Sequence, residues 1–293
     1  MARLLFVHAH PDDETLTCGI TMAHHVAIGD DVHTLTCTLG EEGEVVPPEL
    51  AHLQGAEGDP LGPWRREELR TAMDRLGVQH GVLGEERADG GDGGGTWRDS
   101  GMAGMPSWNH PRAFARADVE RVGFQVAEHL RRLRPDVVVT YDATGGYEHP
   151  DHIQTHRVTM AALRQLGPEE RPASTFHIHT PRSWVAQDRA WLREHVPENL
   201  GIAVPAADDP LIASTVDDDV VTHVVDDPVH VPTQIAALDA HRTQLRVWDG
   251  WYYALTNDVA ARLAGREAFV RVDPLTGARA HTGPLAYELM SRS

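Results

Sequence analysis

Hydrophobic positions at the start of the chain predict a strand, a helix and a second strand. The apolar run from Leu4 to Val7 is typical of a short buried strand. Residues 13–29 carry apolar side chains at helical spacing, and Gly29 closes that helix. Residues 32–39 form the next apolar run. A strand, a helix and a strand in such a short stretch make a βαβ unit, which predicts two parallel strands of a Rossmann-like sheet.

More elements of the same kind follow as far as residue 180. The pattern predicts a helix that ends at Gly77, strands at 78–83, 136–141 and 175–179, and helices at 119–133 and after His152. The fold class is therefore α/β, with a mainly parallel sheet flanked by helices. We expect residues 1–180 to form this Rossmann-like domain.

Residues 181–293 predict a smaller α+β portion that packs on the first domain or continues it. Its expected elements are a helix at 184–196, a strand at 220–225 and a long helix from Val229 to Val247. Aromatic residues gather at 248–253 as core or as a lid, and core is the favoured interpretation. The last twenty residues are expected to be extended or disordered.

Composition narrows the class of partner. The 293 residues are 41% hydrophobic, which is enough for a core, and 26 basic against 44 acidic residues give a net charge of −18. This charge argues against nucleic acid and anionic membranes as partners. Cys18 and Cys37 are too few for a disulfide framework. No segment has the pattern of a signal peptide or a membrane span, so a cytoplasmic location is expected.

The first apolar run ends in a cluster of polar residues, His10-Pro-Asp-Asp-Glu14. The carboxyl edge of an open α/β sheet is where ligands bind. His10 and Asp13 are one helical turn apart, and an imidazole with a carboxylate is a zinc-type pair. Asp12 lies between them and suits a general base acting on metal-bound water. The alternative is that an aspartate here only caps the helix.

A second cluster follows the strand predicted at 136–141. Its sequence is Gly145-Gly-Tyr-Glu-His149-Pro-Asp-His152, and a neighbouring strand would bring it to the same sheet edge. His152 can then complete a His10–Asp13–His152 metal site that leaves a position for water. His149 would face the substrate, and Asp151 would orient one of the two histidines.

These two clusters resemble the zinc-dependent N-acetylglucosaminyl deacetylases, called the PIG-L or LmbE-like family. The resemblance covers residues 3 to 160, and beyond them it is faint except at 237–244. Residues 36–44, 97–104 and 145–147 are most similar to the branch that acts on N-acetyl-glucosaminyl-inositol in mycothiol biosynthesis. The resemblance implies one zinc ion per chain, with Fe²⁺ or another divalent ion as an alternative, and a small sugar-inositol substrate.

The resemblance also assigns residues outside the clusters. It implies that Glu44, Arg65 and Asp99 bind the substrate, while Tyr147 joins His149 and the metal in stabilising the oxyanion. From the residues alone, Arg65 would equally make a surface ion pair with Glu68, and Asp99 would equally be a solvated loop residue. Glu41 and Glu42 are expected in a solvated acidic loop, and the glycine-rich run at 90–95 is expected to flank the site.

Two rival functions remain open at this point. One is an amidase that cleaves mycothiol S-conjugates with the same site, although the chain contains no lysine and the related amidase site is associated with one. The other is a metal- or sugar-binding module without catalysis. In the hydrolase, Asp12 takes a proton from the water and returns it to the leaving amine, or His149 acts as the acid instead.

Overall fold

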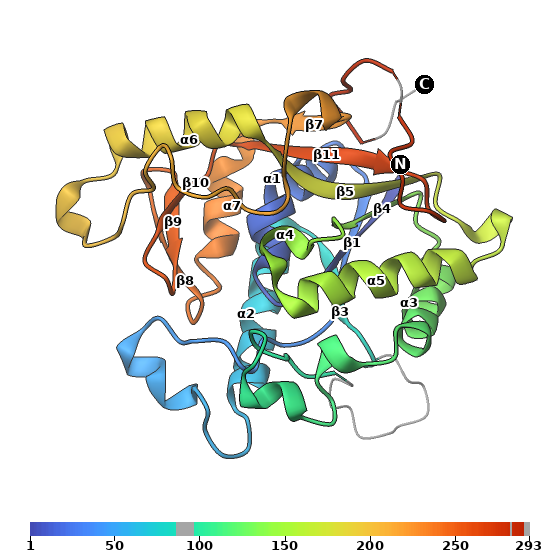
Figure 1. Ribbon diagram of the computed structural model, residues 1–293, viewed down its shortest axis with the longest axis horizontal. Helices are drawn as coiled ribbons and strands as arrows, with labels where there is room; N and C mark the ends of the chain where they lie inside the picture. The colour runs from blue at the N-terminus through green and yellow to red at the C-terminus, as the bar shows by residue number, and fades with distance from the viewer. Residues whose placement is uncertain (86–96, 282, 290–293) are drawn as a thin grey trace.

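A mainly parallel sheet forms the centre of the protein (Figure 1), in a computed structural model that describes residues 1–85, 97–281 and 283–289. Its strands lie in the order β3-β2-β1-β4-β5-β11-β7. They are β1 (Arg3–His8), β2 (Asp31–Thr36), β3 (Gln79–Val82), β4 (Val137–Tyr141), β5 (Ser174–Pro181), β7 (His223–Asp226) and β11 (Arg266–Val272). The first five run parallel, whereas β11 is antiparallel to both of its neighbours.

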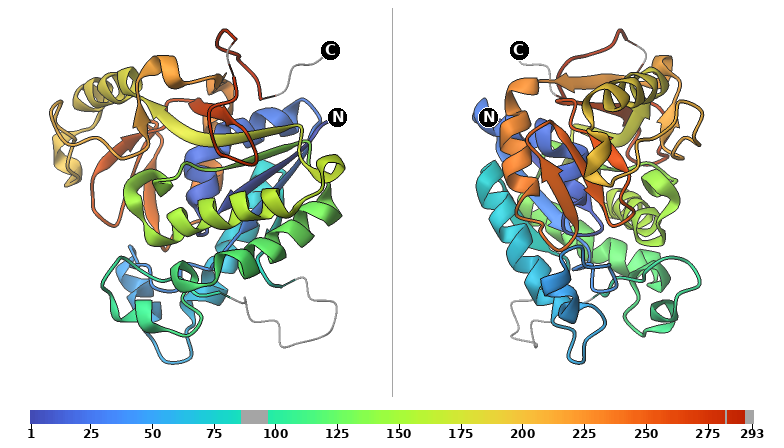
Figure 2. Two further views of the ribbon diagram at one scale, coloured as in Figure 1. Left: turned by 45° about the vertical axis from the view of Figure 1, so that its right-hand side comes forward. Right: turned by 90° about the vertical axis from the view of Figure 1, so that its left-hand side faces the viewer.

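Helices cover both faces of this sheet (Figure 2). One layer contains α1 (Asp13–Ala27), α2 (Leu61–Leu76) and α7 (Val231–Leu238), and the other contains α3 (Val119–Leu133) and α5 (Pro150–Gln165). Strand β1 explains why its sequence is apolar throughout. Leu4 and Phe6 pack in the core on one face, while Leu5 and Val7 pack in the core on the other.

Smaller elements complete the chain. Helix α4 (Gly145–Glu148) precedes α5, and α6 (Arg182–His195) follows β5. Strand β6 (Thr215–Val216) pairs with β5, and β8 (Leu245–Trp248), β9 (Tyr252–Leu255) and β10 (Ala260–Arg262) form a second, antiparallel sheet. Short 3₁₀ helices lie in the connections: η1 (Pro48–Leu53), η2 (Pro106–Asn109), η3 (Phe114–Arg116), η4 (Pro168–Glu170), η5 (Glu198–Leu200), η6 (Asp218–Val220) and η7 (Pro228–His230).

The sheet order brings two turns together. Strands β1 and β4 are neighbours, with Phe6 paired to Val139, and they point the same way. The turn after β1 and the connection from β4 to α5 therefore leave the same edge of the sheet. The α/β class and the mainly parallel sheet predicted from the sequence are confirmed.

The long helix predicted from Val229 to Val247 is wrong. Helix α7 ends at Leu238, a turn follows, and residues from Leu245 onward form β8. The polar residues of that turn bond to α2 and to the turn after β1, as described below, so they cannot continue a helix. Strand β11 was also not foreseen, although it lies between β5 and β7 in the main sheet.

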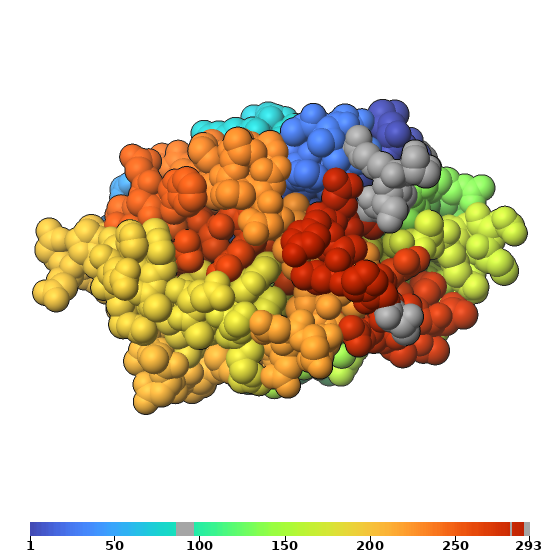
Figure 3. Space-filling view, turned by 90° about the horizontal axis from the view of Figure 1, so that it is seen from above, coloured from blue at the N-terminus to red at the C-terminus, as the bar shows by residue number. Residues whose placement is uncertain are grey.

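Residues beyond β5 cover much of the face seen in Figure 3, where yellow, orange and red atoms predominate. Of the aromatic residues at 248–253, Tyr252 is buried in a small core with Leu192 and Ala260, as predicted, whereas Trp251 is partly exposed. The glycine-rich run at 90–95 lies outside the described residues. Within the described part, no helix is both long and apolar enough to cross a membrane.

Candidate active site

Nine of the ten site residues predicted from the sequence line one cavity of about 360 Å³ at the carboxyl ends of β1 and β4. They are His10, Asp12, Asp13, Glu44, Arg65, Asp99, Tyr147, His149 and His152. The tenth, Asp151, is fully buried behind His10. The fold therefore gathers residues that are more than 140 positions apart in the sequence into a single cavity.

Three donor atoms converge at the bottom of this cavity. Asp13 Oδ2 lies 3.3 Å from His10 Nδ1 and 3.2 Å from His152 Nε2, and the two imidazole nitrogens are 3.3 Å apart. Zinc–ligand bonds of about 2.0–2.1 Å in a tetrahedron put neighbouring ligand atoms roughly 3.3–3.4 Å apart. The three atoms thus have the spacing of ligands that share one ion.

Hydrogen bonds on the far side of each ring orient both imidazoles. His10 Nε2 lies 3.3 Å from Asp151 Oδ2, and His152 Nδ1 lies 3.1 Å from the carbonyl oxygen of Gly145. Each partner is an acceptor, so each of these nitrogens carries a proton and the other nitrogen offers a bare lone pair to the cavity. Gly145 has a φ of 66°, and a Cβ there would lie 2.6 Å from the backbone nitrogen of Ile153. This close turn therefore requires glycine.

His149 lies in the same cluster, but one of its ring nitrogens accepts a hydrogen bond from the backbone, whereas the outer nitrogens of His10 and His152 donate one. The donor atoms of His10, His149 and His152 are within 4.8 Å of one another, so distance alone would permit His149 as a ligand. However, His149 Nδ1 accepts a hydrogen bond of 3.2 Å from the Asp151 backbone N–H at the start of α5. Burial and the nearby His10 and His152 lower its pKa to about 3, so the ring is neutral. Its proton is therefore on Nε2, which makes His149 a hydrogen-bond donor.

The electrostatics of this cluster favour a positive charge. Burial by itself lowers the pKa of His10, but the carboxylates of Asp99, Asp13 and Asp151 outweigh burial and raise it well above its usual value. Burial raises the pKa of Asp13, but His152 and His10 outweigh it and lower that pKa well below its usual range. A cation is therefore stabilised at the point where these groups meet.

Asp12 is held in an unusual backbone conformation at the N-terminus of α1. Its φ of 102° and ψ of −34° lie outside the regions that non-glycine residues normally occupy. The side chain is only 8% exposed. Burial, followed by the neighbouring charges of Asp13 and Glu14, raises the pKa of Asp12 well above its usual value. Strained backbones and raised carboxyl pKa values are both typical of active sites.

Arg65 is buried in α2 and holds a loop in place. Its guanidinium donates to the carbonyl oxygens of Gly40 and Glu44, the latter at 3.0 Å, and to Thr243 Oγ1 at 3.3 Å. A Cβ on Gly43 would overlap the guanidinium, so any other residue there would displace Arg65 from these bonds. Glu68 is also buried and binds Thr243 through both carboxylate oxygens, at 2.9 and 2.7 Å. The alternative of a surface ion pair between Arg65 and Glu68 is therefore wrong.

Asp99 belongs to the wall of the cavity next to His10. Its Oδ1 lies 3.5 Å from His10 Nε2 and accepts from the Gly101 backbone N–H, so it is not a solvated loop residue. The prediction of a solvated acidic loop is likewise wrong for Glu41 and Glu42. Glu41 accepts from the Asp99 backbone N–H at 3.0 Å, and Glu42 pairs with Arg98. These bonds tie the two loops at the rim together.

Three further residues of the site were not foreseen. Tyr141 at the end of β4 stacks on His152, with ring centroids 4.4 Å apart. Gln244 donates a hydrogen bond of 2.6 Å to the carbonyl oxygen of Pro11, and Tyr253 lines the cavity from β9. The position of Tyr141 beside the second cluster was a usable signal. Nothing local to Gln244 or Tyr253 indicates their place.

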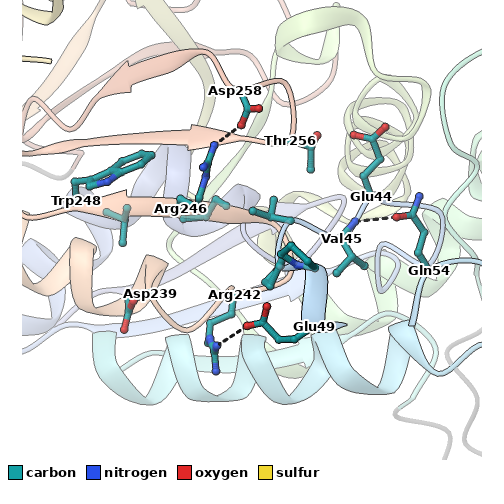
Figure 4. A pocket seen from close by; sticks show the side chains of 15 residues that line it. Glu44, Val45, Glu49, Gln54, Asp239, Arg242, Arg246, Trp248, Thr256 and Asp258 are labelled. Atoms are coloured by element: carbon teal, nitrogen blue, oxygen red, sulfur yellow. Dashed lines mark hydrogen bonds and ion pairs between the residues drawn. The ribbon is translucent and has the colours of Figure 1, made fainter. Parts of the chain in front are cut away.

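A wider groove of about 780 Å³ adjoins the cavity (Figure 4). Glu44 and Thr256 line both spaces. The groove is polar, and its arginines are engaged within it, because Arg246 pairs with Asp258 and Arg242 lies 3.7 Å from Glu49. Of the predicted site residues only Glu44 also lines the groove, which is an open extension of the cavity mouth.

The sheet, the paired clusters and the buried donor atoms define a class of α/β proteins with a metal-type site at the carboxyl edge of the sheet. Residues 5–163, more than half of the chain, match the family described as PIG-L: GlcNAc-PI de-N-acetylase. The chain belongs to this family.

Two relatives are similar over nearly their whole length. Both carry the name 1D-myo-inositol 2-acetamido-2-deoxy-alpha-D-glucopyranoside deacetylase. The protein from Thermomonospora curvata is 45% identical and the alignment covers 92% of this chain and 90% of the relative. The protein from Thermobifida fusca is 42% identical, with 98% and 97% covered.

A solved structure shows the same fold. The N,N'-diacetylchitobiose deacetylase from Pyrococcus horikoshii superposes with a TM-score of 0.53 at 19% identity. The superposition covers 85% of this chain and 73% of that one. At this identity the likeness supports the architecture and does not bear on the substrate.

Proposed function

We propose that the protein is a zinc-dependent hydrolase that removes the acetyl group from N-acetyl-glucosaminyl-inositol, in a step of mycothiol biosynthesis. The products are the free amine and acetate. The observation that carries this proposal is the convergence of His10 Nδ1, Asp13 Oδ2 and His152 Nε2 at the spacing of a tetrahedral ion site. The names of the two relatives, similar over more than nine tenths of this chain, support the substrate.

His10, Asp13 and His152 are the proposed ligands. The other ring nitrogens of His10 and His152 are bound to acceptors, which leaves a lone pair of each ring directed at the cavity. Asp13 Oδ2 accepts from the His10 backbone N–H and has a second lone pair. In His149, by contrast, one ring nitrogen accepts a hydrogen bond and the other is protonated. Two imidazoles and a carboxylate suit zinc and also accept other divalent transition ions such as Fe²⁺. Bound zinc would polarise the acetamide carbonyl and make a neighbouring water molecule more acidic.

Asp12 is the proposed general base. It takes a proton from the attacking water while the water oxygen bonds to the acetyl carbon, and it returns the proton to the amine nitrogen as the carbon–nitrogen bond breaks. Its buried position among carboxylates favours holding that proton. His149 donates from Nε2 to the oxyanion, and the hydroxyl of Tyr147 at the cavity mouth does the same. The neutral state of His149 favours this role over that of the acid.

Substrate binding is assigned to Arg65, Asp99 and Glu44. Arg65 uses two donors to hold the loop at Gly40 to Glu44 and a third to bind Thr243, which leaves N–H groups for sugar or inositol hydroxyls. Asp99 accepts hydrogen bonds from the backbone and can accept further ones from hydroxyls. Glu44 stands at the mouth, where the cavity meets the wider groove.

The test is acetate release by the zinc-loaded protein from N-acetyl-glucosaminyl-inositol, beside release of the amide-linked acyl group from a mycothiol S-conjugate. We expect the acetylated substrate to have the higher kcat/KM. A preference for the conjugate would assign the protein as the amidase instead. A binding module would bind the sugar with no turnover, and its sugar affinity would not require zinc.

A further inference from the structure

A second set of metal-type ligands lies on the far side of α1. His24 near the end of α1, Asp227 after β7 and His230 at the end of η7 place their donor atoms within 4.8 Å of one another. Asp227 Oδ2 is 2.8 Å from His24 Nδ1 and 3.5 Å from His230 Nε2. Two imidazoles and one carboxylate form the same donor set as the site in the active-site cavity.

We propose that His24, Asp227 and His230 form a second binding site for a divalent transition ion of the zinc class. An eleven-residue separation along α1 puts His24 about 16 Å from Asp13, at 1.5 Å per residue. The two sites are therefore distinct. An ion here ties the end of α1 to the connection between β7 and α7, segments about 200 positions apart in the sequence.

The local geometry is close to what such an ion needs. Neighbouring ligand atoms on a tetrahedral zinc ion are roughly 3.3–3.4 Å apart, so the two distances to Asp227 lie on either side of that value. Side-chain exposures of 17–28% leave the group accessible to an ion from solvent and room for a water ligand. A small rotation of the His230 ring about its side-chain bonds can reduce the 3.5 Å between its Nε2 and Asp227 Oδ2 to this spacing.

Neither proton placement nor charge opposes the ion. Without an ion, the proton on His24 Nδ1 is donated to Asp227 Oδ2 at 2.8 Å. An ion would replace this proton, which can leave or move to His24 Nε2, an atom without a hydrogen-bond partner among the described residues. Asp227 is held by its backbone, which donates to the Gly265 carbonyl oxygen and accepts from the His230 N–H. The net charge of −18 raises the local concentration of cations at the surface.

Another histidine–aspartate pair shows what is special about this group. His33 Nε2 lies 2.8 Å from Asp31 Oδ1, and the side chains are similarly exposed. The other carboxylate oxygen of Asp31, however, pairs with the Arg3 guanidinium at 2.7 Å, where the first group has a second histidine. A guanidinium already supplies the positive charge and repels a metal ion. His33→Ala is therefore the matched control, because it removes an imidazole from a carboxylate pair without removing a ligand.

The experiment titrates zinc-loaded protein, carrying one ion per chain, with further Zn²⁺ and with Co²⁺ as a spectroscopic probe. We expect the wild type and His33→Ala to bind a second equivalent, with a visible Co²⁺ absorption of nitrogen and oxygen ligation and a melting temperature that rises with metal concentration. His230→Ala and the isosteric Asp227→Asn should lose the second equivalent, with at least tenfold weaker binding, and keep wild-type deacetylation.

Two results would overturn the proposal. One is a wild type that stops at a single equivalent at metal concentrations well above those that fill the first site. The other is a second equivalent that survives in both variants, since the ion would then lie elsewhere. Unchanged deacetylase activity in the variants shows that they are folded, so a lost equivalent cannot be attributed to unfolding.

Discussion

The strained backbone at Asp12 predicts that activity is maintained at a cost in stability. With φ at 102° and ψ at −34°, Asp12 has a conformation that glycine adopts without strain and other residues do not. Asp12→Gly and Asp12→Ala both remove the carboxylate and its repulsion from Asp13 and Glu14. The two variants therefore differ mainly in backbone strain and in the flexibility of the unfolded chain.

The magnitude follows from those two differences. A residue held in such a region costs about 1–3 kcal/mol, and glycine loses about 0.4–1 kcal/mol more than alanine on folding through its freer unfolded state. Asp12→Gly should therefore be more stable than Asp12→Ala by roughly 1–2 kcal/mol. Both variants should bind zinc as the wild type does and lose about 10²–10⁴-fold in turnover, the usual contribution of a general base.

The assay is denaturant unfolding of the metal-loaded variants at equal zinc excess, with metal analysis and acetate release on the same samples. Asp12→Asn serves as the control, because it keeps the shape of the side chain and the strain but cannot accept the proton. If Asp12→Ala is more stable than Asp12→Gly by the glycine cost of about 0.4–1 kcal/mol, no strain is stored at this residue. If the variants lose zinc, Asp12 is a ligand, and if they keep full turnover another group is the base.

Three other changes test the site and its support. Alanine at His10, Asp13 or His152 should leave nearly metal-free protein by metal analysis, and full occupancy in any variant would exclude that residue as a ligand. Arg65→Ala should raise KM for the sugar-inositol substrate more than for a bare N-acetylated sugar, because a lost charged hydrogen bond costs about 1.5–3 kcal/mol; equal losses on both would contradict substrate contact. Burial raises the pKa of Glu267 to about 7, against three hydrogen bonds that lower it. The stability that this carboxyl contributes is therefore complete below its pKa in the unfolded chain and is lost as pH rises through 7. From pH 5 to 8 the free energy of unfolding of the wild type should fall by up to about 3 kcal/mol relative to Glu267→Gln. Parallel pH profiles for the two proteins would refute this.

The sequence was sufficient to predict the two clusters that meet at the sheet edge, because each follows its own strand directly. Leu4 to Val7 and Val137 to Val139 are apolar on both faces, which identifies central parallel strands. Neighbouring parallel strands end at the same edge, so the polar residues after them must approach one another. Local pattern and topology therefore agree over this half of the chain.

The rest of the cavity depends on long-range contacts that leave no local signal. Thr243 and Gln244 lie in a segment with apolar residues at helical spacing, yet hydrogen bonds to Glu68 and Pro11 hold that segment in a turn. Glu267 on β11 accepts from the backbone N–H groups of Ile20 and Thr21 inside α1. Such pairings, nearly 250 positions apart, are set by the packing of the whole domain and override local propensity.

The different hydrogen-bond partners of His149 and His152 show why residue type alone does not separate a metal ligand from a hydrogen-bond donor. Both are imidazoles of one cluster, both are buried, and both lie within reach of the same point. What separates them is the partner of the other ring nitrogen. The Gly145 carbonyl oxygen accepts the proton of His152 Nδ1, so Nε2 of that ring has a free lone pair. The Asp151 backbone N–H instead donates to His149 Nδ1, so Nε2 of that ring is protonated. One backbone acceptor and one backbone donor thus support the proposed roles, a metal ligand for His152 and a hydrogen-bond donor for His149.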